Sequence, residues 1–388
     1  MVPGHERALD PDSTVVIGDR GTGKSFWSAA LNGIETSRLI AVQLPRLKLD
    51  KIDTSWGFSV SARNQDHPSR RVLQRLQEDF GAEDIWRAVI LHQLAGRHDE
   101  HPPADGWTER VRYVEADPAR EEMLLDHISK HLREKRRRHL IIFDALDRTG
   151  SDWKAIRGLL QVCLDLQGLP GIQAKLFMRP DMWEDKTIWQ FPDASKLHHG
   201  RVDLEWRCAD LYGLLFHWLS NHVTKGKPFR YWLDQKHRLK FEPVPARKNR
   251  VYPIPERLRQ DEAVQQAVLH DMATTYMGTN PRRGLTHTWL PNHLADAKGQ
   301  VSPRSFLIAV REAQRNTQSR GHDEVLHWDG IKQGVQDASR VRVKELGEDY
   351  PWIQDVLVPL CLGCAGHEES GTGPDPGARA DRGHPTHR

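Results

Sequence analysis

The stretch Thr14–Ser25, TVVIGDRGTGKS, decides the fold of this 388-residue chain. Its last eight residues fit the pattern G-x-x-x-x-G-K-[ST], a glycine-rich loop whose backbone amides cradle phosphate groups. The residues before the loop are apolar or β-branched, as in a buried strand, and residues 26–32 are typical of a helix that ends at Gly33. A strand, a glycine loop and a helix in this order predict a P-loop, which binds the phosphates of a nucleotide.

Each fixed position of the loop has a predicted role. The glycines allow backbone angles that a side chain disfavours, and they let main-chain amides approach the phosphates. Lys24 is expected to reach the β- and γ-phosphates of a bound nucleotide, and Ser25 to hold Mg²⁺ through its hydroxyl. The predicted nucleotide-binding residues are Gly18, Asp19, Arg20, Gly21, Thr22, Gly23, Lys24, Ser25 and Phe26.

A second apolar run, His139–Phe143, ends in an acidic residue, Asp144. In a parallel sheet such a carboxylate emerges at the carboxyl edge of the strands, where ligands bind. Asp144 is therefore predicted to hold Mg²⁺ together with Ser25. Many P-loop ATPases carry a catalytic Glu directly after this Asp, but this chain has Ala145, and its next acid is Asp147.

The order of strand, Asp, small residue, apolar residue and acid resembles the STAND group of signal-transduction ATPases, in particular its NACHT-like members. The resemblance implies that Asp147 orients or activates the attacking water. Arg148 stands where these ATPases usually have a second acid, and this departure favours slow, switch-like hydrolysis.

Arg179-Pro180 follows another predicted strand, 174–178. By the same resemblance Arg179 occupies the position that senses the γ-phosphate, with an ordinary surface arginine as the alternative. The Asn-Lys-x-Asp signal of small GTPases is absent from the sequence, which favours ATP over GTP. The predicted catalytic residues are Lys24, Asp147 and Arg179.

Alternating strand and helix patterns predict an α/β fold with a doubly wound parallel sheet, in which Arg38–Leu44 would be the second core strand. A helical lid is expected to follow. The predicted domains are a P-loop NTPase core at 1–222 with a helical insertion at about 55–138, a basic, proline-containing connector at 223–261, the lid at 262–360 and a disordered tail at 361–388.

Three arginines of the predicted lid are candidates for a nucleotide contact, and the sequence does not choose between them. Arg304 lies near the start of a helix that Ser302 and Pro303 would begin, since Ser suits the N-cap and Pro the first helical turn. Arg282 and Arg283 lie in the short segment before it.

Composition bounds the remaining choices. The chain is 38% hydrophobic and 28% charged, as in a globular protein with a polar surface. It has no apolar run long enough to span a membrane and no apolar leader, and its four cysteines are too few for a disulfide framework. These features predict a cytoplasmic protein that does not enter a membrane. The net charge of +3 does not by itself indicate a nucleic-acid partner.

One segment, 224–260, is strongly basic, unlike the chain as a whole, with eleven Lys or Arg residues and three acids. Interleaved aromatics such as Tyr231 and Trp232 would suit a nucleic-acid groove, whereas four prolines indicate an extended connector or a protein-docking surface.

The function we expect is a Mg²⁺-dependent, slowly hydrolysing ATPase that acts as a conformational or assembly switch. The STAND resemblance implies prokaryotic signalling or anti-phage defence, with a protein partner or separately encoded effector, and a homo-oligomer. The alternatives are a nucleic-acid-dependent ATPase and a non-hydrolysing ATP-binding interaction protein.

Overall fold

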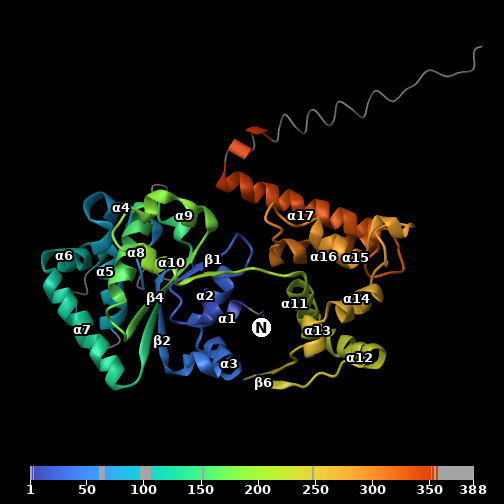
Figure 1. Cartoon of the computed structure of the whole chain (residues 1–388), viewed down its shortest axis with the longest axis horizontal. Helices are drawn as coiled ribbons and strands as arrows, with labels where there is room; N and C mark the ends of the chain where they lie inside the picture. The colour runs from blue at the N-terminus through green and yellow to red at the C-terminus, as the bar shows by residue number, and fades with distance from the viewer. Residues whose placement is uncertain are drawn as a thin grey trace, which may run out of the picture.

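A computed structural model describes residues 2, 4–60, 66–96, 106–150, 153–246, 249–350, 352–353 and 355–356. In these ranges the chain forms a sheet part, on the left of Figure 1, and a helical part, on the right. The predicted tail lies outside the described residues. No helix within the described ranges is long and apolar enough to cross a membrane.

The sheet has five strands in the order β2-β3-β4-β1-β5, and every neighbouring pair is parallel. Most residues of the central strands are buried, as expected for a parallel sheet covered on both faces. The predicted doubly wound α/β fold is therefore confirmed. The strands are β1 (Val15–Ile17), β2 (Ile52–Phe58), β3 (Arg138–Phe143), β4 (Ile172–Met178) and β5 (Arg201–Asp203).

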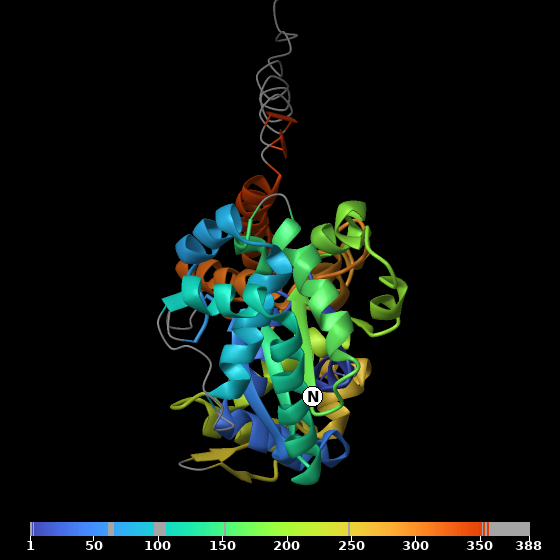
Figure 2. The ribbon, with the colours of Figure 1, turned by 90° about the vertical axis from the view of Figure 1, so that its left-hand side faces the viewer.

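Helices cover the two faces because successive strand residues point in opposite directions. Val15 and Ile17 of β1 belong to the apolar cluster on one face, and Val16 belongs to the cluster on the other. Figure 2 looks onto the larger face, where light-blue to green helices lie in front of the strands. That face holds α4 (Arg70–Asp79), α5 (Ala82–Ala95), α6 (Gly106–Ala116), α7 (Pro118–Glu134) and α8 (Lys154–Leu166); the opposite face holds α1 (His5–Leu9), α2 (Lys24–Asn32) and α3 (Ile34–Gln43).

The expected strand at Arg38–Leu44 is wrong, because this run lies in helix α3 and buries only Ile40. The second strand in the chain is β2, whose sequence IDTSWGF has polar residues in its middle and gives no continuous apolar signal. As an edge strand it is held by polar contacts. The Arg137 guanidinium donates to both carboxylate oxygens of Asp53, at 3.0 and 2.6 Å, and Ser55 Oγ lies 2.9 Å from Nε2 of His139.

The helical part has its own apolar cluster, formed by buried residues between Leu211 and Ala338. Phe229 and Trp232, from the segment expected to be a connector, pack against it, and α11 contributes buried residues to it. Short helices α9 (Pro180–Glu184) and α10 (Ser195–His198) lie between β4 and β5. The helical part contains α11 (Cys208–Ser220), α12 (Gly226–His237), the hairpin β6 (Val244–Ala246) and β7 (Asn249–Val251), α13 (Glu256–Gln260), α14 (Glu262–His270), α15 (Thr286–Asn292), α16 (Pro303–Ser319) and α17 (Trp328–Asp349).

Two long helices, α16 and α17, form the side of the helical part that reaches toward the P-loop (Figure 1). Ser302 caps α16 by accepting a hydrogen bond from the backbone amide of Ser305 at 3.1 Å, as its sequence predicts. Gly330 and Gly334 let α17 approach closely, since a Cβ at either position would overlap backbone atoms of α16. This packing fixes the direction in which α17 runs past the loop.

Candidate functional site

The P-loop connects the carboxyl end of β1 to the start of α2. Gly21 and Gly23 have φ angles of 80° and 105°, in the left-handed region that favours glycine. The helix begins at Lys24, so the backbone amides of its first turn have no partner within the helix. The loop therefore combines free amide donors with the positive end of a helix dipole, which is the arrangement that binds phosphate.

The Lys24 side chain lies folded over its own loop. Its Nζ donates to the carbonyl oxygens of Gly18, at 2.5 Å, and Asp19, at 2.9 Å. Burial lowers the pKa of Lys24 to about 8, while the nearby carboxylate of Asp144 acts in the opposite direction. The charges of Asp147 and Arg179 also act on this ammonium group. A phosphate group would replace two loop carbonyls with a stronger, charged acceptor.

Asp144 follows β3 and is only 5% exposed. Its Oδ2 accepts a hydrogen bond from Ser28 Oγ, one turn along α2 from Ser25, at 3.1 Å. Ser25 itself is an exposed residue at the start of α2. A buried carboxylate bonded to the Ser28 hydroxyl, with Ser25 one turn earlier on the same helix, offers the hard oxygen donors that Mg²⁺ prefers, so the residues present fit the predicted ion.

Asp147 reaches the site because the backbone turns sharply after Asp144. Ala145 adopts a left-handed conformation, with φ 56°, and a single 3₁₀ turn at Leu146–Arg148 follows. The Asp147 carboxylate remains 35% exposed and lies 3.9 Å from Nη1 of Arg179. Water thus has access to the acid that the sequence predicts to position it.

Arg179 emerges from the end of β4 and is the N-cap of α9. Its Nε and Nη2 donate to the two carboxylate oxygens of Asp181, both at 2.8 Å. Because β4 lies between β1 and β3, the sheet order brings the loop, Asp144, Asp147 and Arg179 to one edge. The structure therefore brings together the predicted residues Lys24, Asp144, Asp147 and Arg179.

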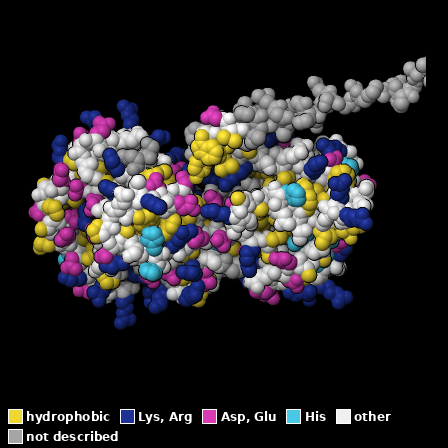
Figure 3. All heavy atoms as spheres, turned by 45° about the horizontal axis from the view of Figure 1, so that its top comes forward, with side chains coloured by type: hydrophobic (Ala, Val, Ile, Leu, Met, Phe, Trp, Pro, Cys, Tyr) yellow, Lys and Arg dark blue, Asp and Glu magenta, His cyan; other side chains and the backbone are white. Residues whose placement is uncertain are grey.

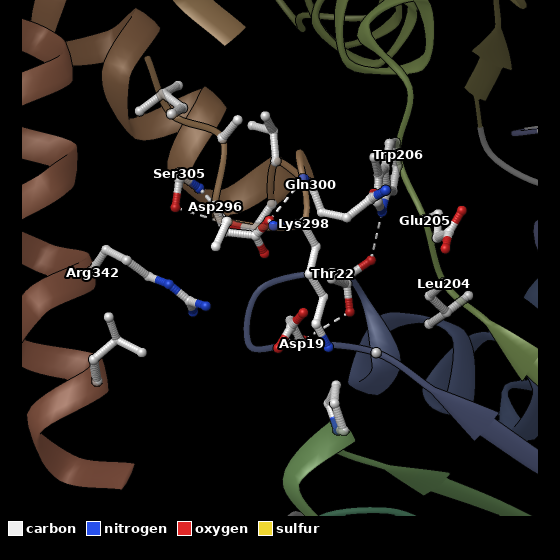
Figure 4. A pocket seen from close by; sticks show the side chains of 18 of the residues that line it. Asp19, Thr22, Leu204, Glu205, Trp206, Asp296, Lys298, Gln300, Ser305 and Arg342 are labelled. Carbon is white, nitrogen blue, oxygen red and sulfur yellow. Dashed lines mark hydrogen bonds between the residues drawn. The ribbon is translucent and has the colours of Figure 1, made fainter. Parts of the chain in front are cut away.

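A cavity of about 560 Å³ lies between the P-loop and the helical part, beside their contacts. Gly18, Asp19 and Thr22 line one side of it, and residues of the 293–305 segment and α17 line the other. Figure 4 shows Arg342 of α17 pointing into this cavity toward Asp19. The cavity opens beside the loop, where a nucleotide bound by the loop would have room for its remaining atoms.

Two of the three predicted lid arginines lie away from this cavity. Arg282 and Arg283 belong to a 3₁₀ turn, Pro281–Arg283, and neither lines it. Arg304 lies against the loop, since a Cβ on Gly21 would come within 2.9 Å of the Arg304 Cβ. Its guanidinium pairs with Glu345 of α17 at 2.7 Å. Arg342 of α17, whose Nη1 lies 3.8 Å from the same Glu345, lines the cavity and faces the loop.

The loop also contacts the helical part and the segment that leads to it. Arg20 pairs with Glu348 of α17 at 2.7 Å. The indole of Trp206, between β5 and α11, donates to the backbone oxygen of Thr22 at 2.8 Å. By contrast Phe26, predicted among the nucleotide-binding residues, is 67% exposed.

Ser28, Asp181, Trp206 and Arg342 were not among the predicted site residues. Asp181 has the clearest sequence signal, because an acid two residues after an arginine, in the first turn of a helix, is well placed to pair with it. Trp206 and Arg342 belong to no motif, and only the packing of the helical part brings them to the loop.

The parallel sheet, the glycine loop after β1 and the acid after β3 define the fold of a P-loop nucleoside triphosphatase. No protein-family model and no curated protein matches the sequence. Among solved structures, the chain is similar to the Aeropyrum pernix ORC2 protein in ADPNP–ADP complexes, with 12% identity, a TM-score of 0.35, and coverage of 87% of this chain and 64% of that one.

The chain is also similar to CDC6P from Pyrobaculum aerophilum, with 10% identity, a TM-score of 0.34, and coverage of 84% and 65%. It therefore spans less than two thirds of the length of either neighbour. Because both TM-scores are low, the class of this protein rests on its own sheet and loop.

Proposed function

We propose that this protein binds ATP with Mg²⁺ at the P-loop and hydrolyses it slowly, as a nucleotide-controlled switch. The observation that carries the proposal is the convergence of Lys24, Asp144, Asp147 and Arg179 at one edge of the sheet. A structural role alone does not require a buried lysine, two acids and an arginine beside an anion-binding loop.

Each residue has a distinct role in this proposal. Lys24 and the loop amides hold the β- and γ-phosphates, and Arg179 contacts the γ-phosphate. Ser25 and Asp144 hold Mg²⁺, which neutralises charge that develops on the phosphates. Asp147 accepts a hydrogen bond from the attacking water and orients it.

Slow turnover and switching follow from two features. Ala145 leaves no carboxylate directly after Asp144, so the attacking water would be oriented by Asp147, a partly exposed acid further along the chain. The loop also touches the helical part through Arg20 and Gly21, so phosphates that displace Arg20 from Glu348 would loosen that contact. Nucleotide state would then change how the two parts meet.

The switch would act in the cytoplasm on a protein partner, a separately encoded effector or a second copy of the chain, as in STAND, NACHT-like signalling or defence ATPases. The end of α17 supports a protein contact. Tyr350, Trp352 and Val356 are 36%, 61% and 49% exposed there, and Figure 3 shows hydrophobic side chains gathered beside the point where the described chain ends. Exposed apolar groups of this kind are typical of interaction surfaces.

Calorimetric titration with ATP and GTP, with and without Mg²⁺, followed by single-turnover hydrolysis of radiolabelled ATP, tests the proposal. We expect Mg²⁺-dependent binding, tighter for ATP than for GTP, and slow formation of ADP. Binding without ADP formation would instead support a non-hydrolysing ATP-binding interaction protein. Absence of nucleotide binding would contradict the proposal.

A nucleic-acid-dependent ATPase is the second candidate, favoured by the surface around α12. Tyr231 is 67% exposed, and six cations there are exposed and form no ion pair with any described residue. These cations are Lys225, Lys227, Arg238, Lys240, Arg250 and Arg257. Turnover measured with and without DNA or RNA, at several salt concentrations, separates this candidate, since phosphate contacts weaken steeply with salt.

A further inference from the structure

Arg179 is held by an acid that lies outside the predicted motifs. The Nε and Nη2 atoms of Arg179 donate to Oδ1 and Oδ2 of Asp181, both at 2.8 Å. This two-point contact uses one edge of the guanidinium group and leaves Nη1 on the other side, 3.9 Å from Asp147 Oδ2. Arg179 therefore lies between two carboxylates and is bonded through its fork to Asp181.

The two carboxylates hold Arg179 very differently. A bidentate pair fixes both the position and the plane of a guanidinium group, whereas 3.9 Å is too long for a hydrogen bond. The Arg179 and Asp181 side chains are 12% and 19% exposed, against 35% for Asp147. The better shielded pair is the stronger of the two, so Asp181 holds the guanidinium more firmly than Asp147 does.

We propose that Asp181 is a positioning residue for nucleotide hydrolysis, an inference that rests on the proposed ATPase function. By holding the Nε–Nη2 edge of Arg179, Asp181 prevents the guanidinium from moving into direct contact with Asp147. The guanidinium then keeps an orientation from which it can meet the γ-phosphate, and the partly exposed Asp147 carboxylate stays open to water. Without Asp181, Arg179 and Asp147 would neutralise each other, and both roles would weaken.

The variant Asp181→Asn tests this role with little change in side-chain size. We expect kcat to fall about 10- to 100-fold, the range that loss of alignment produces. The preference for ATP over ADP should fall toward that of Arg179→Ala, with ADP affinity unchanged within about twofold, because only ATP offers the γ-phosphate to Arg179. Asp185→Asn is the matched control, since Asp185 caps the next turn through Thr187 at 2.8 Å and should leave both quantities unchanged.

A double-mutant cycle separates positioning from a merely structural effect. If Asp181 acts through Arg179, Asp181→Asn should change kcat by less than about twofold in the Arg179→Ala background. Thermal unfolding of each variant shows whether the fold is kept. A wild-type rate and ATP preference in Asp181→Asn, or an undiminished loss in the Arg179→Ala background, would overturn the inference.

Nucleotide binding by the wild-type chain and by Lys24→Ala separates a failure of the role of Asp181 from a failure of the proposed function. If Lys24→Ala loses nucleotide binding but the cycle shows no coupling, only the role of Asp181 fails. If the wild-type chain binds nucleotide without hydrolysing it, the ATP-over-ADP preference alone decides the role of Asp181. If the wild-type chain binds no nucleotide, the proposed function and this inference fail together.

Discussion

The carboxyl edge of the sheet and the helical part that faces it hold their charges in different ways. At the sheet edge, Asp144 and Arg179 are nearly buried. Asp144 accepts a hydrogen bond from Ser28 of α2, and Arg179 pairs with Asp181 of α9. Across the cavity, the Arg20–Glu348 pair joins side chains that are 26% and 68% exposed. Buried charges are costly to leave unpaired, whereas an exposed ion pair contributes about 0–1 kcal/mol.

This difference indicates a division of labour. Under the proposed function, the sheet edge would be preorganised for phosphate chemistry, and the weaker contact with the helical part would open and close around it. Substitutions at the sheet edge should therefore have large effects on binding or catalysis. Substitutions across the cavity should have small ones, and the predictions below follow that order.

The largest effect is expected for Lys24→Ala. The variant removes a charged donor to two phosphates, and each such hydrogen bond contributes about 1.5–3 kcal/mol, so ATP should bind at least about 100-fold more weakly. Calorimetric titration measures the affinity, with Lys51→Ala, an exposed lysine of the same part, as the control. Unchanged ATP affinity in Lys24→Ala would contradict the claim that the sheet edge holds the phosphates.

Asp147→Asn should slow hydrolysis by about 100-fold or more while ATP binding stays within about twofold of wild type, because the amide is a poor acceptor for the proton of the attacking water. Single-turnover rates together with equilibrium binding measure the two effects separately. Normal turnover in this variant would remove Asp147 from the catalytic role.

The pH dependence of ATP binding should reflect Lys24. Burial lowers the pKa of Lys24 to about 8 in the empty site, and bound phosphate favours the charged form and so raises this pKa. ATP affinity should be constant below about pH 7 and weaken by up to about tenfold per pH unit above pH 8. Binding curves between these values test this, and a profile no steeper than that of Lys24→Ala would contradict it.

The smallest effect is expected across the cavity. Glu348→Gln removes the charge that holds Arg20, and because this pair is exposed, ATP affinity should change by less than about threefold. The direction should be toward tighter binding, since one charge that competes with the phosphates for Arg20 is removed. Glu312→Gln, which breaks ion pairs of α16 with Arg311 and Arg315, serves as the control. A change of tenfold or more would mean that the helical part belongs to the binding site itself.

The same contrast explains what the sequence predicts well. The P-loop and the acid after β3 depend on backbone conformation and strand ends, which neighbouring residues determine. The fold class follows from these elements and from their alternation with helices. Asp181 was missed although it lies only two residues from Arg179, because its role depends on a side-chain pair formed in three dimensions.

Long-range packing accounts for the rest. The edge strand β2 is stabilised by Arg137 and His139 from the neighbouring β3 region and has no apolar run of its own. Arg38–Leu44 is apolar enough to resemble a strand, yet residues 38–43 belong to helix α3, which buries only Ile40. Arg342 and Trp206 reach the cavity or the loop only because the helical part packs beside the sheet.

The most direct test of the central claim is single-turnover hydrolysis of ATP by the wild-type chain and Asp147→Asn, with Mg²⁺ and with a chelator. The account predicts slow, Mg²⁺-dependent formation of ADP by the wild type, and ATP that stays bound and intact on Asp147→Asn. Equal rates in the two proteins, or ADP formation that does not depend on Mg²⁺, would contradict the claim that the sheet edge acts as one hydrolytic site.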